Sequence, residues 1–396
     1  MRNLSINDND DNNNTEGSAA WVTIFSQSLI PCGMIGRSAK LTTRLVVPVN
    51  VGGSALRLRF SNRPAKKESR LDEVHIAESD ESGAIVLSTG RQVTFNGNKE
   101  LVLAAGAEAV SDRIEMPLRA GQYLALSLYS AKQPHSANSL GSHGIRSRRG
   151  NYCTGNFEVD RREYLTGRLL KMPIDTTIPL FRGMDVLTQE NPVVISCLGD
   201  SNTQQCRWYT PLLARLYRAY PGKAALLNAG ISGNRLMKDS PPGWGNMFGA
   251  AGIKRVEYDS FADHGLSHIL LALGTNDLFQ AESRFDKTPP PAPEEFVGIC
   301  RDMAEKIHAR GLKVIAMTLY PISFDKAPVK EKLRLAYNDI IRGGVFDDYI
   351  DVEGVLKNPG KPGYRDGYAI ADGVHLTEAG GKAAADSVDL AKFMGY

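Results

Sequence analysis

Four short polar segments in the second half of the chain carry side chains that could act together on an ester. The nucleophile candidate is Ser201, whose hydroxyl reacts only after a base removes its proton, and His375 is the candidate base. Asp372, three residues before the histidine, can accept a hydrogen bond from the other ring nitrogen and hold the reactive tautomer. The developing oxyanion also needs donors, and the candidates are the backbone N–H groups of Ser201 and Gly233 and the side-chain amide of Asn276. The four segments are residues 199–202 (Gly-Asp-Ser-Asn), 228–234 (Asn-Ala-Gly-Ile-Ser-Gly-Asn), 274–277 (Gly-Thr-Asn-Asp) and 372–375 (Asp-Gly-Val-His).

Each of these segments follows an expected strand or precedes an expected helix. The apolar, β-branched run at 193–198 predicts a strand buried on both faces, and the apolar spacing at 207–220 predicts an amphipathic helix. Further strands are expected at 224–229, 268–273, 314–319 and 349–352, and further helices at 294–310, 329–342 and 377–392. This alternation predicts a parallel sheet between helices, and the carboxyl ends of parallel strands share one edge. The segments should therefore converge, although Ser201 by itself could simply cap a helix.

The four segments in this order resemble the SGNH hydrolases, the GDSL-type esterases and lipases. Gly199-Asp200-Ser201 is similar to the family's nucleophile block, with Asn202 where the family's name has leucine. The resemblance implies a three-layer α/β/α domain of flavodoxin-like type. It also implies Ser201, Asp372 and His375 as the catalytic triad, and Ser201, Gly233 and Asn276 as the oxyanion hole. Residues 51–62 and 105–112 resemble the amino-terminal β-domain of a bacterial subgroup that includes carbohydrate esterases and arylesterases.

The first half of the chain has the pattern of an all-β domain. Strands are expected at 41–49, 55–61, 73–77, 84–87, 92–95 and 122–130, separated by turns rich in glycine, which is typical of a β-sandwich. The predicted organisation is a disordered tail at 1–19, a β-sandwich-like domain with a linker at 20–188, and the catalytic domain at 189–396. The linker is expected within 131–188, where a basic stretch is either a groove for an acidic ligand or a solvated loop.

Composition excludes several classes of function. The net charge is +3, with 42% hydrophobic and 23% charged residues, which gives no case for binding nucleic acid or a membrane. Five cysteines without CxxC pairing predict reduced thiols and a cytoplasmic location, unless a signal peptide has been removed. No cofactor and no metal are expected, because a triad and an oxyanion hole complete the chemistry. The expected partner is a small-molecule or oligosaccharide ester.

Several alternatives remain open at this stage. His264 and His268 could be metal ligands, although no third ligand accompanies them. Asp366 is a second candidate for the acid that orients His375, and Trp244 could form the wall of an acyl or sugar pocket or simply pack. The favoured function is a short-chain esterase that acts on a carbohydrate. The rivals are an arylesterase, a lysophospholipase, an acyltransferase, and a carbohydrate-binding protein with a vestigial hydrolase domain.

Overall fold

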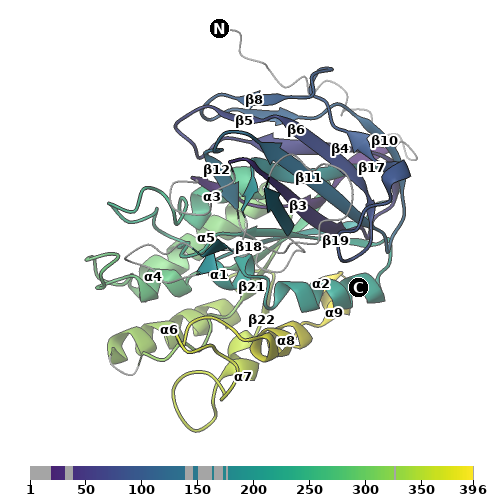
Figure 1. Cartoon of the computed structure of the whole chain (residues 1–396). Helices are drawn as coiled ribbons and strands as arrows, with labels where there is room; N and C mark the ends of the chain where they lie inside the picture. Colours follow the sequence, from purple (N-terminus) through teal and green to yellow (C-terminus); the bar gives the residue numbers. More distant parts are fainter. Residues whose placement is uncertain are drawn as a thin grey trace.

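The computed structural model describes residues 19–31, 39–138, 177–324 and 327–395, and the backbone of short strands at 146–149, 163–164 and 173–174. Several sequence-based expectations lie outside these residues: the tail at 1–18, two of the five cysteines, Tyr152 and most of the basic stretch. The described chain consists of an antiparallel β-region followed by an α/β-region, stacked one above the other in Figure 1. Within the described parts, no helix has both the length and the apolar character needed to cross a bilayer.

Two five-stranded antiparallel sheets form the β-region, as the sequence predicted. One sheet has the order β1-β17-β4-β10, with β9 also paired to β4, and the other has the order β13-β3-β11-β6-β7. The first contains β1 (Ala20–Ser26), β17 (Phe181–Thr188), β4 (Gly53–Ser61), β10 (Ile114–Leu118) and β9 (Glu108–Val110). The second contains β13 (Arg146–Arg149), β3 (Leu41–Pro48), β11 (Tyr123–Ser130), β6 (Glu73–Ser79) and β7 (Arg91–Gln92). Smaller pairings join β16 (Ile178–Pro179), β12 (Ser136–Asn138) and β2 (Ile30–Pro31), β5 (Ser69–Leu71) with β8 (Leu101–Leu103), and β14 (Glu163–Tyr164) with β15 (Pro173–Ile174).

Three details of the β-region differ from the sequence prediction. The strand expected at 84–87 is a single β-bridge at Ile85 followed by the short 3-10 helix η1 (Leu87–Thr89), because Val86 and Leu87 are exposed and have no core to face. The strand expected at 92–95 is reduced to β7 and a bridge at Phe95. The segment taken as a linker contains β17, which lies between β1 and β4 and is almost wholly buried.

The α/β-region contains a five-stranded parallel sheet in the order β19-β18-β20-β21-β22. Counted from the first strand of the region this is the order 2-1-3-4-5, the flavodoxin-like arrangement that the resemblance to the SGNH hydrolases implied. The strands are β18 (Val193–Gly199), β19 (Ala224–Gly230), β20 (Leu266–Ala272), β21 (Lys313–Met317) and β22 (Asp348–Ile350). The helices are α1 (Ser201–Gln204), α2 (Tyr209–Ala219), α3 (Gly252–Asp259), α4 (Thr275–Phe279), α5 (Pro293–His308), α6 (Pro328–Arg342), α7 (Val352–Leu356), α8 (Glu378–Asp386) and α9 (Leu390–Phe393).

Two of the expected helices are divided in the structure. The helix expected at 207–220 begins only at Tyr209, because the chain first forms the short α1 and then turns at Cys206, which has a φ of +61°. The helix expected at 377–392 is interrupted after Asp386, and Asp389 starts α9 by accepting hydrogen bonds from the N–H groups of Ala391 and Lys392. The short helices α3, α4 and α7 were not predicted.

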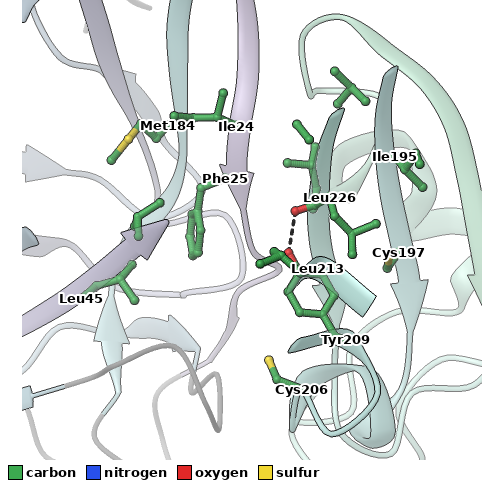
Figure 2. Packing of buried hydrophobic residues seen from close by; sticks show 14 of the residues in the cluster. Ile24, Phe25, Leu45, Met184, Ile195, Cys197, Cys206, Tyr209, Leu213 and Leu226 are labelled. Atoms are coloured by element: carbon green, nitrogen blue, oxygen red, sulfur yellow. Dashed lines mark hydrogen bonds between the residues drawn. The ribbon is translucent and has the colours of Figure 1, made fainter. Parts of the chain in front are cut away.

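The two regions share one hydrophobic core. A single cluster of buried side chains contains Phe25 and Leu45 of the β-region together with Cys197, Tyr209 and Leu226 of the α/β-region. Figure 2 shows these side chains on the two sides of the boundary, with the hydroxyl of Tyr209 bonded to the carbonyl of Leu226. A second cluster packs β20 and β21 against α3, α5 and α6. Burial of this shared apolar surface holds the two regions together, and each Å² removed from water contributes roughly 25 cal/mol of stabilising free energy.

Buried ion pairs also cross the boundary between the regions. Arg59 of β4 donates to the carboxylate of Asp263 at 2.7 Å and to the carbonyl of Ala262 at 2.7 Å. Asp185 of β17 is fully buried beside Arg59 and beside His264, one of the two histidines considered as metal ligands. Burial raises the pKa of Asp185, but Arg59, the contact with His264 and Arg57 outweigh that effect and hold the pKa well below its usual value. His264 therefore has a structural role beside a buried carboxylate.

Candidate active site

Ser201 lies where the sequence predicted, at the turn between β18 and α1. Gly199 ends the strand, and a Cβ on this residue would lie 1.9 Å from the Thr203 hydroxyl, so only glycine fits. Asp200 is the N-cap of α1, and its carboxylate accepts the backbone N–H of Asn202 at 3.0 Å. The cap is therefore Asp200, and the Ser201 hydroxyl is left to make other contacts.

A continuous hydrogen-bond chain joins the serine, the histidine and an aspartate. The Nε2 atom of His375 is 2.9 Å from Ser201 Oγ, and its Nδ1 atom is 2.6 Å from Asp372 Oδ2. The other carboxylate oxygen of Asp372 accepts the backbone N–H groups of Val374 and His375. Burial raises the pKa of Asp372, but the hydrogen bonds from His375 and Val374 outweigh it, so the pKa lies below its usual value. The carboxylate is thus charged and oriented toward the imidazole.

The alternative acid, Asp366, takes no part in this chain. Its side chain is 86% exposed and pairs with Lys361 at 3.1 Å on the surface. The geometry therefore selects Asp372, as the three-residue spacing predicted, over Asp366 as the partner of His375.

The candidate oxyanion donors surround the same turn. Within the described residues, the backbone N–H groups of Ser201 and Gly233 make no hydrogen bond to the protein. Gly233 has a φ of +72°, and a Cβ there would lie 2.4 Å from the ring of Phe248, so both conformation and space require glycine. The amide of Asn276 donates one N–H to Asp200 Oδ2 at 3.2 Å, which leaves its second N–H for a ligand.

Asp200 is a buried carboxyl beside these donors. Burial raises its pKa to about 6, although the backbone N–H of Asn202 and the neighbouring His375 and Arg255 side chains act in the opposite direction. Its two oxygens are held by Asn202 and Asn276, so the acid connects the serine turn to the candidate oxyanion amide.

Asn202 explains how the histidine segment is held against the serine helix. Its side-chain oxygen accepts the backbone N–H of Leu376 at 3.1 Å, and its amide donates to the carbonyl of Val374 at 3.4 Å. These two residues flank His375, so an asparagine at this position fixes the imidazole in a way that leucine could not.

The polar segments do not form a metal site. His268 contacts the hydroxyl of Ser267 at 3.1 Å, whereas His264 contacts the carboxylate of Asp185. In the described portion of the chain, no three histidine, cysteine, aspartate or glutamate side chains cluster as metal ligands would.

Sequence comparison agrees with this geometry. Residues 197–383 match the GDSL-like lipase/acylhydrolase family, a range that contains all four polar segments. This part of the chain belongs to that family. As a GDSL-like hydrolase, the protein is a carboxylic ester hydrolase of the SGNH superfamily.

Solved structures with a similar fold cover about half of this hydrolase. An acetyl xylan esterase from Geobacillus stearothermophilus is 18% identical and covers 52% of this chain and 95% of its own, with a TM-score of 0.40. The psychrotrophic esterase EstA from Pseudoalteromonas sp. is 18% identical and covers 52% of this chain and all of its own (100%), with a TM-score of 0.38. An aryl esterase from M. smegmatis is 16% identical and covers 49% and 94%, with a TM-score of 0.37. No curated protein matches the sequence.

The sequence did not predict the role of Arg255, which holds the strand ends beside the candidate site in place. Arg255, on α3, is fully buried and donates to the carbonyls of Gly199 at 2.7 Å and Ala229 at 2.8 Å. It also donates to Asn234 at 2.7 Å and pairs with Asp259 at 3.0 Å. It thus ties together the ends of the two strands that carry Ser201 and Gly233. No sequence signal marks it, because an isolated arginine on a short helix ordinarily faces water.

A half-buried aromatic cluster lies next to Gly233. Trp244, Phe248 and Phe285 have ring centroids 4.9–5.8 Å apart, and the ring of Phe248 touches the α-carbon side of Gly233. The sequence left Trp244 open between packing and a substrate wall. It does pack, but against rings that border the candidate oxyanion donors.

A separate cavity of about 180 Å³ lies between the β-region and the α/β-region. Its walls include Arg63, Glu108, Arg182, Ile231 and Tyr258, and none of the candidate catalytic side chains. It is therefore distinct from the position at which Ser201 and His375 meet.

Proposed function

We propose that the chain hydrolyses short-chain, acetyl-type esters of a carbohydrate or similar polyol through an acyl-enzyme on Ser201. The observation that carries this mechanism is the hydrogen-bond chain from Ser201 Oγ through His375 to Asp372, with distances of 2.9 and 2.6 Å. A neutral imidazole with its Nδ1–H on a carboxylate presents the lone pair of Nε2 to the serine, which is the tautomer that a general base needs.

The reaction has two halves. In the first, Ser201 Oγ attacks the ester carbonyl, its proton passes to His375 Nε2, and the leaving alcohol takes that proton as the acyl-enzyme forms. In the second, water gives a proton to the same nitrogen as it attacks the acyl carbon, and the bond from Ser201 Oγ to the acyl carbon then breaks. The acid is released, and the nitrogen returns the proton to Ser201 Oγ. In both, the N–H groups of Ser201, Gly233 and Asn276 donate to the oxyanion. These steps use only backbone and side-chain groups of the hydrolase, and water.

The aromatic cluster supports the choice of substrate. The ring of Phe248 lies directly against Gly233, which limits the space for an acyl chain beside the oxyanion donors. The negative face of the half-buried Trp244 suits the C–H groups of a sugar ring, and it would equally suit an aryl leaving group. An arylesterase is therefore the second candidate.

The test is a series of esters with one leaving group. We expect kcat/KM to fall steeply from acetyl through butyryl to octanoyl 4-nitrophenyl esters, since a misfit methylene costs roughly 1–3 kcal/mol. Acetylated sugars are then compared with phenyl acetate and with a lysophospholipid. A profile that rises toward octanoyl, or a preference for the lysophospholipid, would contradict the carbohydrate assignment but leave the serine mechanism intact.

The mechanism itself is tested with Ser201→Ala. Turnover should fall by at least about three orders of magnitude, and a phosphonylating reagent should label the wild type but not the variant. Full activity in Ser201→Ala would refute the mechanism. A folded wild type that turns over no ester in the series would favour the carbohydrate-binding alternative, and transfer of the acyl group to an added alcohol in preference to water would favour an acyltransferase.

A further inference from the structure

A line of buried amides runs from the β-region into the candidate active site. Asn138 of β12 is 1% exposed, and its amide donates to the carbonyl of Ser28 at 2.5 Å. Its side-chain oxygen accepts the amide of Gln204, the last residue of α1. The oxygen of Gln204 accepts both the backbone N–H of Ser232, at 2.7 Å, and the Ser232 hydroxyl, at 2.6 Å. These four residues are called the amide relay below.

The direction of every bond in the amide relay is fixed by its two ends. The N–H of Ser232 can only donate, so the oxygen of Gln204 must face it and the NH2 of Gln204 must face Asn138. Asn138 must then present its oxygen to Gln204 and its NH2 to the carbonyl of Ser28, which can only accept. Two amide side chains satisfy this sequence of donors and acceptors, whereas a carboxylate at either position would place two acceptors face to face.

The end of the relay is next to a proposed catalytic group. Ser232 immediately precedes Gly233, whose N–H is a candidate oxyanion donor. The N–H of Gly233 belongs to the peptide between Ser232 and Gly233. Gln204 holds the preceding peptide through the Ser232 N–H, and Gln280 holds the following peptide by donating to the Gly233 carbonyl at 2.6 Å. Because glycine has no side chain to restrict its own backbone, these two contacts help to set the direction of its N–H, together with the turn bond from the Asn234 N–H to the Ile231 carbonyl.

We propose that Asn138 of the β-region is a positioning residue for ester hydrolysis, which acts through Gln204 to aim the Gly233 N–H at the oxyanion. This inference rests on the proposed function of Ser201 and Gly233. It makes the β-region a part of the catalytic centre and not an appended module. An oxyanion donor that is misaligned still contributes partly. Misaligning the Gly233 N–H should therefore lower kcat less than deleting a donor does.

The chain offers a matched control at the other end of the same boundary. Asn50 is also a β-region asparagine, 3% exposed, and its amide donates across the boundary to the carbonyls of Tyr220 at 3.1 Å and Ala224 at 2.7 Å. Ala224 begins β19, whereas Asn138 acts at the end where β19 leads into the Ser232–Gly233 turn. Asn50→Ala therefore removes comparable contacts between the regions without touching the relay.

The first experiment measures kcat and KM for 4-nitrophenyl acetate hydrolysis by Asn138→Ala and Asn50→Ala, corrected for the folded fraction. We expect Asn138→Ala to lower kcat about 10- to 100-fold with KM within about two-fold, because the donor acts on the transition state. Asn50→Ala should have a lower Tm than the wild type but the same kcat. An unchanged kcat in Asn138→Ala, or an equal loss of kcat in both variants, would overturn the inference.

A second variant keeps the test decisive if Asn138→Ala does not fold. Gln204→Glu retains an oxygen for Ser232 but turns an acceptor toward Asn138, unless the carboxyl is protonated and can donate. The ratio of its kcat to that of the wild type should therefore rise as pH is lowered, and a flat ratio would overturn the proposal. Ser201→Ala is assayed in parallel. If it remains active, the proposed function fails, whereas an inactive Ser201→Ala with a normal Asn138→Ala refutes the relay alone.

Discussion

Replacing Asn276 by alanine should separate a catalytic amide from a structural one. The side chain is 7% exposed and has two N–H groups, of which one is bonded to Asp200 at 3.2 Å. If the second donates to the oxyanion, Asn276→Ala should lower kcat by about 10²–10³, which corresponds to roughly 3–4 kcal/mol of transition-state stabilisation. KM should change little, because the ground-state carbonyl carries no full charge.

The same substitution should also lower stability by a predictable amount. Asp200 would lose one of its two hydrogen-bond donors in a buried position, which costs about 1–3 kcal/mol. The assay is therefore steady-state hydrolysis of 4-nitrophenyl acetate, with active sites counted by phosphonate titration, next to urea unfolding. Asn338→Ala is the control, since Asn338 is fully buried and bonds Leu319 and Glu353 away from the serine.

The two interpretations give opposite results. If Asn276 is catalytic, Asn276→Ala lowers turnover per titrated site far more than Asn338→Ala does when both variants lose the same stability. If Asn276→Ala unfolds more easily but each folded molecule turns over normally, Asn276 only satisfies Asp200, and the assignment of the oxyanion hole is wrong.

Three further predictions concern charged groups. Asp372→Asn should reduce kcat by several orders of magnitude, about 10⁴-fold, whereas Asp366→Asn should stay within about two-fold; the reverse ranking in the same assay would show that the wrong acid was chosen. Arg255→Met should lower the free energy of urea unfolding by about 3–5 kcal/mol, since its buried carboxylate partner would be left unpaired, and a loss below 1 kcal/mol would contradict this. Burial raises the pKa of both Asp200 and Asp277 from 3.8 to about 6, so both bind protons more tightly when folded. Their contribution to the free energy of unfolding is thus full below about pH 4 and lost as pH rises through 6, and Asp277→Asn should flatten this decline in urea titrations across that range.

The sequence singles out candidate site residues where chemistry restricts the residue type. Ser201, Asp372 and His375 could be placed because strand ends of a parallel sheet converge, and the structure brings all three within hydrogen-bonding distance. Gly233 was singled out because a missing side chain lets the backbone approach a substrate closely. In the structure, the ring of Phe248 fills the space that a Cβ would need. The regular alternation predicted a parallel sheet between helices, whereas its flavodoxin-like type was implied by the resemblance to the SGNH hydrolases.

The residues that hold the site in place could not be predicted in this way. Arg255, Asn138 and Gln204 have ordinary polar side chains, and their roles depend on contacts between segments far apart in the sequence. The strand in the 131–188 segment was not predicted, for a related reason. Its strand β17 becomes recognisable only when β1 and β4 are known to flank it, since register and burial are set by those partners.

The position of β1 has a consequence for how the chain folds during synthesis. This strand pairs with β17, 162 residues later at Thr23 and Asp185, and Thr23 also contacts His264, 241 residues later. At 5–20 residues per second, a ribosome needs roughly ten to fifty seconds to make these partners. An apolar strand must therefore remain unpaired until β17 has been made, and pairings over such sequence distances also form slowly. We expect the nascent chain to depend on a holding chaperone until the serine turn itself has been made.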